Sequence, residues 1–226
     1  MKFSVPVLLS LNAGYVDTAG FLALQGLFTA HVTGNFVTLG AALVLGTSGV
    51  LAKLLALPVF CAVILSTRLL APSLPGLGLP VLRTMLWLKL ILLAAGAAMA
   101  IAIGPGHPAS EPAMVVTGML LVAAMAIQNA VSRIHLGASP PTTLMTGTTT
   151  QMMIDLADLW RGLRAEERAA ATGRLARMGA NVGAFAGGCA AGAILFSQIK
   201  MGCFVVPPLL AVVPLLLDAT KEKPAA

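Results

Sequence analysis

Charged residues are scarce in this chain of 226 residues: Asp, Glu, Lys and Arg together make up 10% of it. A soluble domain usually carries about 25% of such residues, so too few are present to cover a water-facing surface. Hydrophobic residues reach 58%, which excludes a disordered chain, because disordered chains are poor in apolar residues. The composition therefore predicts an integral membrane protein whose main partner is the lipid bilayer.

Catalytic and cofactor-binding signatures are missing as well. The sequence contains no GxxxxGK phosphate loop, no GxSxG elbow and no HExxH zinc motif. The three cysteines, Cys61, Cys189 and Cys203, lie in apolar stretches without metal-ligand spacing. We therefore expect neither an enzyme nor a bound metal or cofactor, and we do not expect this chain alone to drive transport with ATP.

Long apolar runs are what the sequence has in abundance, and a transmembrane helix needs about 20 mostly apolar residues. Two further segments, 31–46 and 142–159, begin with small polar residues and hold only about 11–14 helical residues, which suits re-entrant half-helices better than full spans. We predict an all-α polytopic membrane protein in which 1–226 form a single transmembrane domain of six spans and two re-entrant half-helices. The alternative is eight spans. The six full spans are expected at 5–28, 51–70, 85–103, 113–131, 175–196 and 201–217.

The placement of Lys and Arg distinguishes the two topologies. Lys89 lies within a span, where we expect it to snorkel towards the inner end, and 13 positive residues remain. With six spans and a cytoplasmic N-terminus, 11 of them lie inside and two, Lys53 and Lys200, outside; with eight spans the division is 9 to 4. The positive-inside rule favours six spans with both termini cytoplasmic.

The two short segments also suggest an internal repeat. Thr33-Gly34-Asn35 aligns with Thr146-Gly147-Thr148 at an offset of 113, and Asp17 aligns with Asn129 at an offset of 112. Three full spans in each half would give the halves opposite orientations, as in many transporters. We predict an inverted 3+3 repeat with halves at 5–104 and 112–218, against the alternative of chance similarity between Thr- and Gly-rich segments.

Asp17 is the strongest candidate for chemistry. A carboxylate in the middle of a span costs roughly 2.5–3.5 kcal/mol on insertion scales, and such residues usually mark ion or proton pathways. His31 lies in the same half and would form a proton relay with Asp17. The structural alternatives are an Asp17 that caps a helix break and an interfacial His31.

The two Thr-Gly turns are the candidate binding site. Gly34 and Gly147 let the backbone bend or approach closely, and the helix N-termini that follow would offer free N–H groups to an anion near the midplane. The alternative is that these polar groups only satisfy the backbone of broken helices. The candidate substrate-binding residues are Asn12, Asp17, His31, Thr33, Gly34, Asn35, Gln128, Asn129, Thr146, Gly147 and Thr148.

Small residues and a basic segment complete the pattern. Gly179, Gly183, Gly187 and Ala191 recur every four residues, which predicts close helix packing within the chain or, alternatively, a homo-oligomer interface. Residues 160–178 form a basic amphipathic connector that we expect at the cytoplasmic surface, near anionic lipid headgroups. The net charge of +6 thus reflects cytoplasmic loops and not nucleic-acid binding.

The stretch GYVDTAGFLALQGLFTAHVTGN (14–35) resembles the signature of the YoaK-like family. In the second half, Gln128-Asn129-Ala130 and Thr146-Gly147 are similar to that family's second motif block. The resemblance covers roughly residues 5–215 and implies a bacterial, multi-span protein of the inner (cytoplasmic) membrane. It implies no activity, because the family is assigned to a domain of unknown function.

We therefore expect a secondary transporter for a small polar or anionic solute, with Asp17 and His31 coupling proton movement to alternating access. A passive, channel-like facilitator is the first alternative, since opposed half-helices also build pores. A membrane scaffold subunit that transports nothing is the second. The identity of the solute is beyond the sequence.

Overall fold

In a computed structural model, residues 4–137 and 139–219 are described, and within these ranges the regular structure is entirely helical. The helices follow the apolar runs of the sequence, because a backbone in lipid must satisfy its own hydrogen bonds. The α-helices are α1 (Val5–Ala23), α2 (Gly34–Leu45), α3 (Val50–Leu70), α4 (Val81–Ile103), α5 (Pro112–Ile134), α6 (Met145–Arg161), α7 (Ala165–Ile199) and α8 (Val206–Ala219).

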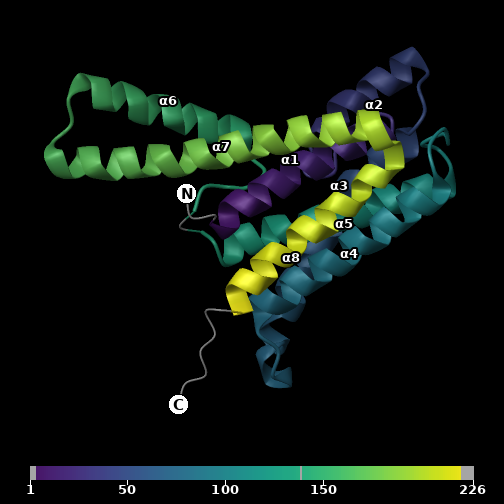
Figure 1. Ribbon diagram of the computed structural model, residues 1–226, viewed down its shortest axis with the longest axis horizontal. Helices are drawn as coiled ribbons and strands as arrows, with labels where there is room; N and C mark the ends of the chain where they lie inside the picture. The colour runs from purple at the N-terminus through teal and green to yellow at the C-terminus, as the bar shows by residue number, and fades with distance from the viewer. Residues whose placement is uncertain (1–3, 138, 220–226) are drawn as a thin grey trace.

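Five segments in the described residues are long and apolar enough to cross a membrane: Val5–Ala23, Val50–Ser73, Val81–Ile103, Pro112–Ile134 and Ala165–Leu217. The last of them spans 53 residues and turns back on itself at Lys200, whose φ of 47° ends α7 before a short 3-10 segment. Figure 1 shows α7 and α8 running in opposite directions from this turn. The prediction of an all-α fold is confirmed for the described residues, and the five apolar segments are consistent with a multi-pass membrane protein.

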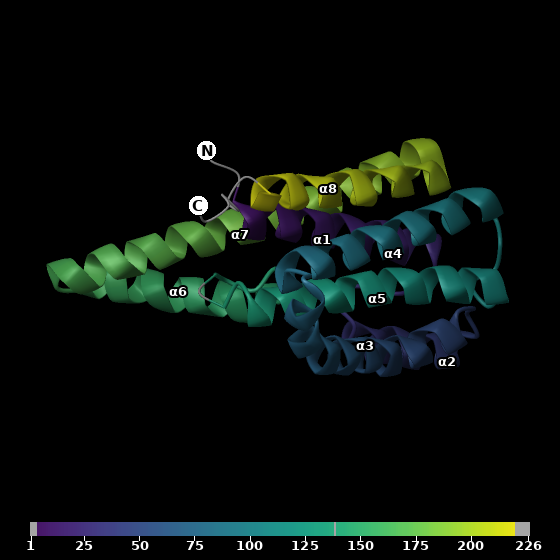
Figure 2. The same cartoon turned by 90° about the horizontal axis from the view of Figure 1, so that it is seen from below.

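The bundle is held together by contacts between the first and second halves of the chain. Helix α1 packs along α7, α5 packs between α3 and α4, and α8 covers α1 and α4. In both views α1 and α5 run in opposite directions, and so do α3 and α7 (Figures 1 and 2). The larger buried cluster draws on α1, α3, α4, α5 and α8 and includes the fully buried Leu93, Val122 and Met125.

Close packing of α1 on α7 depends on glycines that lie one position away from the expected stripe. A Cβ at Gly188 would overlap the carbonyl oxygen of Leu11, and a Cβ at Gly192 would lie 2.8 Å from that of Tyr15. A Cβ at Gly14 would overlap the carbonyl oxygen of Phe185 in return.

At the glycines of the expected stripe, an added Cβ would make at most an ordinary van der Waals contact. A Cβ at Gly179 would lie 3.6 Å from Met152 on α6, whereas one at Gly183 would have no neighbour within 4 Å. The close approach of small residues within the chain therefore occurs on the adjacent face of α7, and the predicted oligomer interface stays a prediction.

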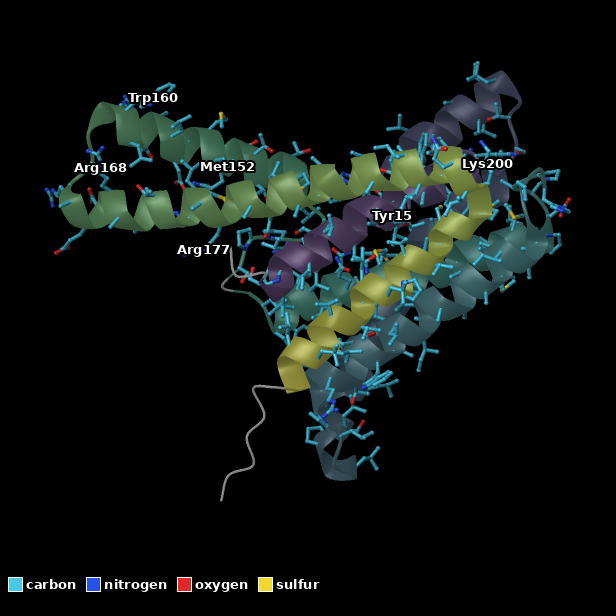
Figure 3. The ribbon with its side chains drawn as sticks, in the orientation of Figure 1. Tyr15, Met152, Trp160, Arg168, Arg177 and Lys200 are labelled. Carbon is cyan, nitrogen blue, oxygen red and sulfur yellow. The ribbon has the colours of Figure 1, made fainter. Side chains whose placement is uncertain are left out.

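Helix α6 and the first turns of α7 form a hairpin, here called the arm, that projects from the bundle (Figures 1 and 2). The expected connector at 160–178 is not a separate element, because α7 is one continuous helix of 35 residues. Only a short turn at Gly162, with φ of 91°, separates it from α6. Figure 3 shows Trp160 and Arg168 near the tip of the arm and Met152 between its two helices.

Five positive residues that the structure describes lie at the two ends of the bundle. Arg68, Arg83 and Arg133 lie where α3 ends, α4 begins and α5 ends, at the end of the bundle from which the arm projects. Lys53 and Lys200 lie at the opposite end, near the α2–α3 connection and the turn after α7.

Candidate functional site

Asp17 is 5% exposed and organises the segment that follows α1. Its Oδ1 atom accepts hydrogen bonds from the backbone N–H groups of Thr29 at 2.7 Å, Ala30 at 2.8 Å and His31 at 3.4 Å. The Thr29 hydroxyl is a further donor at 3.4 Å. Backbone N–H groups compensate a buried carboxylate well, so this carboxylate fixes the path by which residues 24–33 return into the bundle before α2.

Asn35 holds the same returning segment from the other side. Its Oδ1 accepts a hydrogen bond of 2.8 Å from the Phe28 N–H, and its Nδ2 donates one of 2.7 Å to the Phe28 carbonyl. The Phe28 ring lies against Gly34, where a Cβ would come within 2.9 Å of it. The Thr33-Gly34-Asn35 turn therefore fixes the start of α2. A side chain at position 34 would press on the Phe28 ring, which favours glycine there.

The second half has a comparable arrangement at the end of α5. Asn129 accepts a hydrogen bond of 2.6 Å from the Thr143 hydroxyl, which ties the segment before α6 to α5. The neighbouring Thr142 bonds to Gln128 at 3.2 Å and to Ser132 at 2.9 Å. Residues 139–144 thus return along α5 as residues 24–33 return along α1.

The two returning segments meet at a cavity of about 380 Å³, here called the central cavity. His31 and Thr33 line it from the first segment, Thr143 lines it from the second, and Asn129 lines it from α5. Arg133 and Arg68 lie in its wall, together with apolar residues of α3. The cavity therefore combines hydroxyl, amide and imidazole groups with two guanidinium groups, a set that suits a small polar or negatively charged ligand.

The remaining predicted site residues lie around the central cavity without lining it. Asp17, Gly34 and Asn35 form the support behind the first segment. Asn12 donates a hydrogen bond of 3.2 Å to the Pro207 carbonyl and joins α1 to α8. Thr146 is exposed on α6, and Gly147 and Thr148 line a second cavity at the base of the arm.

Lys89 is a functional candidate that the sequence did not indicate. It is 1% exposed, and its Nζ donates a hydrogen bond of 2.6 Å to Oε1 of Gln128, 39 residues away. The Gln128 Nε2 atom donates to the Leu9 carbonyl at 2.9 Å. The expected snorkelling of Lys89 is wrong, because the side chain points into the bundle, where Gln128 satisfies it.

Asp155 joins the two helices of the arm. Its carboxylate accepts hydrogen bonds from Nη2 of Arg174 at 3.0 Å and from Nε at 3.2 Å, and Gln151 donates another at 3.0 Å. The hydrogen bonds from Arg174 hold the pKa of the Asp155 carboxyl below its usual value. This pair fixes α6 against α7 at a point between the bundle and the tip of the arm.

The long apolar helices are consistent with a multi-pass α-helical membrane protein. Residues 5–217 match the family described as "Protein of unknown function (DUF1275)", and the chain belongs to this family. No curated protein and no solved structure is significantly similar to it.

Proposed function

We propose that this protein is a secondary transporter of the bacterial inner membrane for a small polar or anionic solute, and that the central cavity is the solute site. The observation that carries the proposal is the meeting of the two returning segments at one cavity with His31, Thr33, Asn129 and Thr143 in its wall. In many transporters, interrupted helices from two repeats provide the polar groups of the binding site in this way.

The packing pattern supports an inverted repeat of residues 5–104 and 112–218. If α1–α4 correspond to α5–α8, the contact of α1 with α7 corresponds to that of α5 with α3. Likewise, α2 on α3 corresponds to α6 on α7, and α4 on α5 corresponds to α8 on α1. Corresponding helices run in opposite directions in Figure 1, as alternating access between two equivalent halves requires.

We further propose six spans, formed by α1, α3, α4, α5, α7 and α8, with both termini on the cytoplasmic side. The argument is the positive-inside rule applied to the end of the bundle that carries Arg68, Arg83, Arg133 and the arm. A single-cysteine label in the α2–α3 connection at residues 46–49 tests it, in a variant whose own cysteines are replaced. Labelling from the cytoplasmic side at that position would refute the six-span topology.

Proton coupling is proposed to act through Asp17 and His31. The Asp17 carboxylate holds the backbone of residues 29–31, and residues 30 and 31 form part of the cavity wall. Hydrogen bonds to an ionised carboxylate are roughly twice as strong as those to a neutral group. Protonation of Asp17 would therefore loosen the wall that His31 occupies, and this links the charge on Asp17 to the shape of the site.

Uptake and proton flux in proteoliposomes, screened with small anions, amino acids and sugars, test the function. The informative variants are Asp17→Asn, which keeps an acceptor but cannot titrate, and His31→Gln, with His107→Gln at the opposite end as the matched control. Saturable uphill uptake that is lost in Asp17→Asn and kept in His107→Gln supports coupled transport. Flux that survives Asp17→Asn without its pH dependence indicates a facilitator. No flux of any solute by folded, inserted protein would leave a scaffold subunit as the function.

A further inference from the structure

The second cavity, at the base of the arm, is lined by an unusual number of cationic side chains. It measures about 410 Å³ and is here called the arm cavity. Arg133 enters it from the end of α5, and Arg174 and Arg177 enter it from α7, one turn apart. Figure 3 shows Arg177 on the part of α7 where the arm joins the bundle.

The charges of this cavity are only partly balanced. Arg174 is held by Asp155 in a two-bond pair. Arg133 and Arg177 form no side-chain hydrogen bond or ion pair with any residue that the structure describes. No carboxylate lines the cavity, so two guanidinium groups from different helices face one space without a negative partner.

The remaining walls complement these two groups. The first turns of α6 contribute Gly147, Thr148 and Gln151 to the wall. The chain before α6 closes the other side with Pro140 and Pro141. Helix α6 begins without a side-chain cap, so its first N–H groups add positive potential at the same place. The apolar part of the wall, which includes Leu144 and Met178, suits a ligand with a charged head and an uncharged remainder.

We propose that the arm cavity binds a phosphate group through Arg133 and Arg177. A phosphate carries up to two negative charges and several acceptor oxygens, and arginine forks bind such oxygens in pairs. Two unpaired arginines on separate helices therefore match one phosphate better than a singly charged carboxylate. The phosphate belongs either to a small soluble compound or to the headgroup of a membrane lipid.

The proposal does not depend on transport, because it concerns binding at a cavity distinct from the central one. The two cavities share Arg133 and Leu144 in their walls. A phosphate bound in the arm cavity would thus lie beside the segment that closes the central cavity. Binding can be measured whether or not any solute is transported, so failure of one proposal leaves the other intact.

The test compares the full-length protein with Arg133→Gln/Arg177→Gln, the cavity variant, and with Arg177→Gln alone, which leaves the central cavity untouched. Loss of binding in Arg177→Gln alone assigns the site to the arm cavity. The matched control is Arg161→Gln/Arg168→Gln, which removes the same charge from the arm without touching the cavity. Both double variants replace exposed side chains, and equal elution in size-exclusion chromatography checks that they fold. Arg177→Lys keeps the charge and removes the fork, so we expect intermediate binding.

Two measurements separate the sources of the phosphate. The first is equilibrium binding of radiolabelled inorganic phosphate in maltoside detergent, which contains no phosphate. The second is retention of phosphatidylglycerol, counted by native mass spectrometry after extraction from vesicles of phosphatidylglycerol and phosphatidylcholine. We expect the cavity variant to weaken one of these at least about tenfold, because it removes charge-assisted hydrogen bonds from two arginines.

Each outcome decides the proposal. Saturable phosphate binding that is lost in the cavity variant and kept in the control assigns the site to soluble phosphate compounds. Retention of phosphatidylglycerol with the same dependence, and no binding of free phosphate, assigns it to a lipid headgroup. Absence of both kinds of binding, or equal loss in the cavity variant and the control, would overturn it.

Discussion

Adding one methyl group at Gly188 should separate α1 from α7. A Cβ there would overlap the backbone oxygen of Leu11, and a backbone atom cannot turn aside as a side chain can. Overpacking costs about 1–3 kcal/mol, and we take the upper end because a whole helix must shift. Alanine regains about 1 kcal/mol of helix propensity over glycine. The free energy of unfolding should therefore fall by about 2 kcal/mol in Gly188→Ala.

Gly183→Ala is the matched control, since a Cβ at Gly183 meets nothing within 4 Å. It should leave the free energy of unfolding unchanged or raise it by up to about 1 kcal/mol. The assay is thermal unfolding of the detergent-solubilised protein, where 2 kcal/mol corresponds to a fall in Tm of about 4–8 °C for a domain of this size. Equal Tm values for the two variants would refute the close contact of α1 with α7.

Three other perturbations test the buried polar contacts. Asp17→Ala should lower the free energy of unfolding by about 2–6 kcal/mol, because two short backbone N–H bonds lose their acceptor at about 1–3 kcal/mol each; Asp17→Asn should lower it less, and equal Tm values would contradict this role. Gln128→Leu should destabilise the protein by about 3 kcal/mol, because it leaves the buried ammonium of Lys89 unpaired. The double change Lys89→Met/Gln128→Leu should destabilise it much less. Additive effects in a double-mutant cycle would show that the two side chains do not interact. Arg174 lowers the pKa of Asp155 in the folded state. The contribution of this ion pair to the stability of the arm is therefore present above the unfolded pKa of about 4 and is lost as the pH falls through the lower folded value. Protease cleavage in the arm should increase in acid, and in Asp155→Asn it should be raised already at neutral pH.

The sequence predicts the apolar helices well because lipid imposes one requirement on every span. Helix α3 at Val50–Leu70 and α5 at Pro112–Ile134 lie within a few residues of the runs expected at 51–70 and 113–131. The connector expected at 160–178 is not a separate element, because a run of charged residues does not by itself end a helix. Ala, Arg and Glu are strong helix formers, and no proline interrupts 165–178, so α7 extends through the charged segment.

The sequence indicates which stretches of the chain hold polar groups for a site. It does not indicate which of those side chains share one cavity. Thr33 and Gly34 do open α2, but the second predicted turn is wrong, because α6 already begins at Met145 and contains Thr146 and Gly147. His31, Thr33 and Asn129 line one cavity. Arg133 entered the sequence argument only as a topological charge, because no local pattern shows which end of α5 faces a cavity. Lys89 and Gln128 lie 39 residues apart, and only the packing of α4 on α5 brings them together.

In the proposed repeat, the two halves place different groups at one equivalent position. Asp17 is titratable, and three backbone N–H groups of the first returning segment converge on its Oδ1. Asn129 is neutral, and a single hydroxyl, that of Thr143, satisfies its oxygen. The position of the first segment therefore depends on a group that can gain a proton, whereas the position of the second does not. Any pH-dependent movement of the central cavity should for this reason arise on the side of His31, and Asn129→Asp should not reproduce it, because Thr143 offers one hydroxyl where the first segment offers three N–H groups.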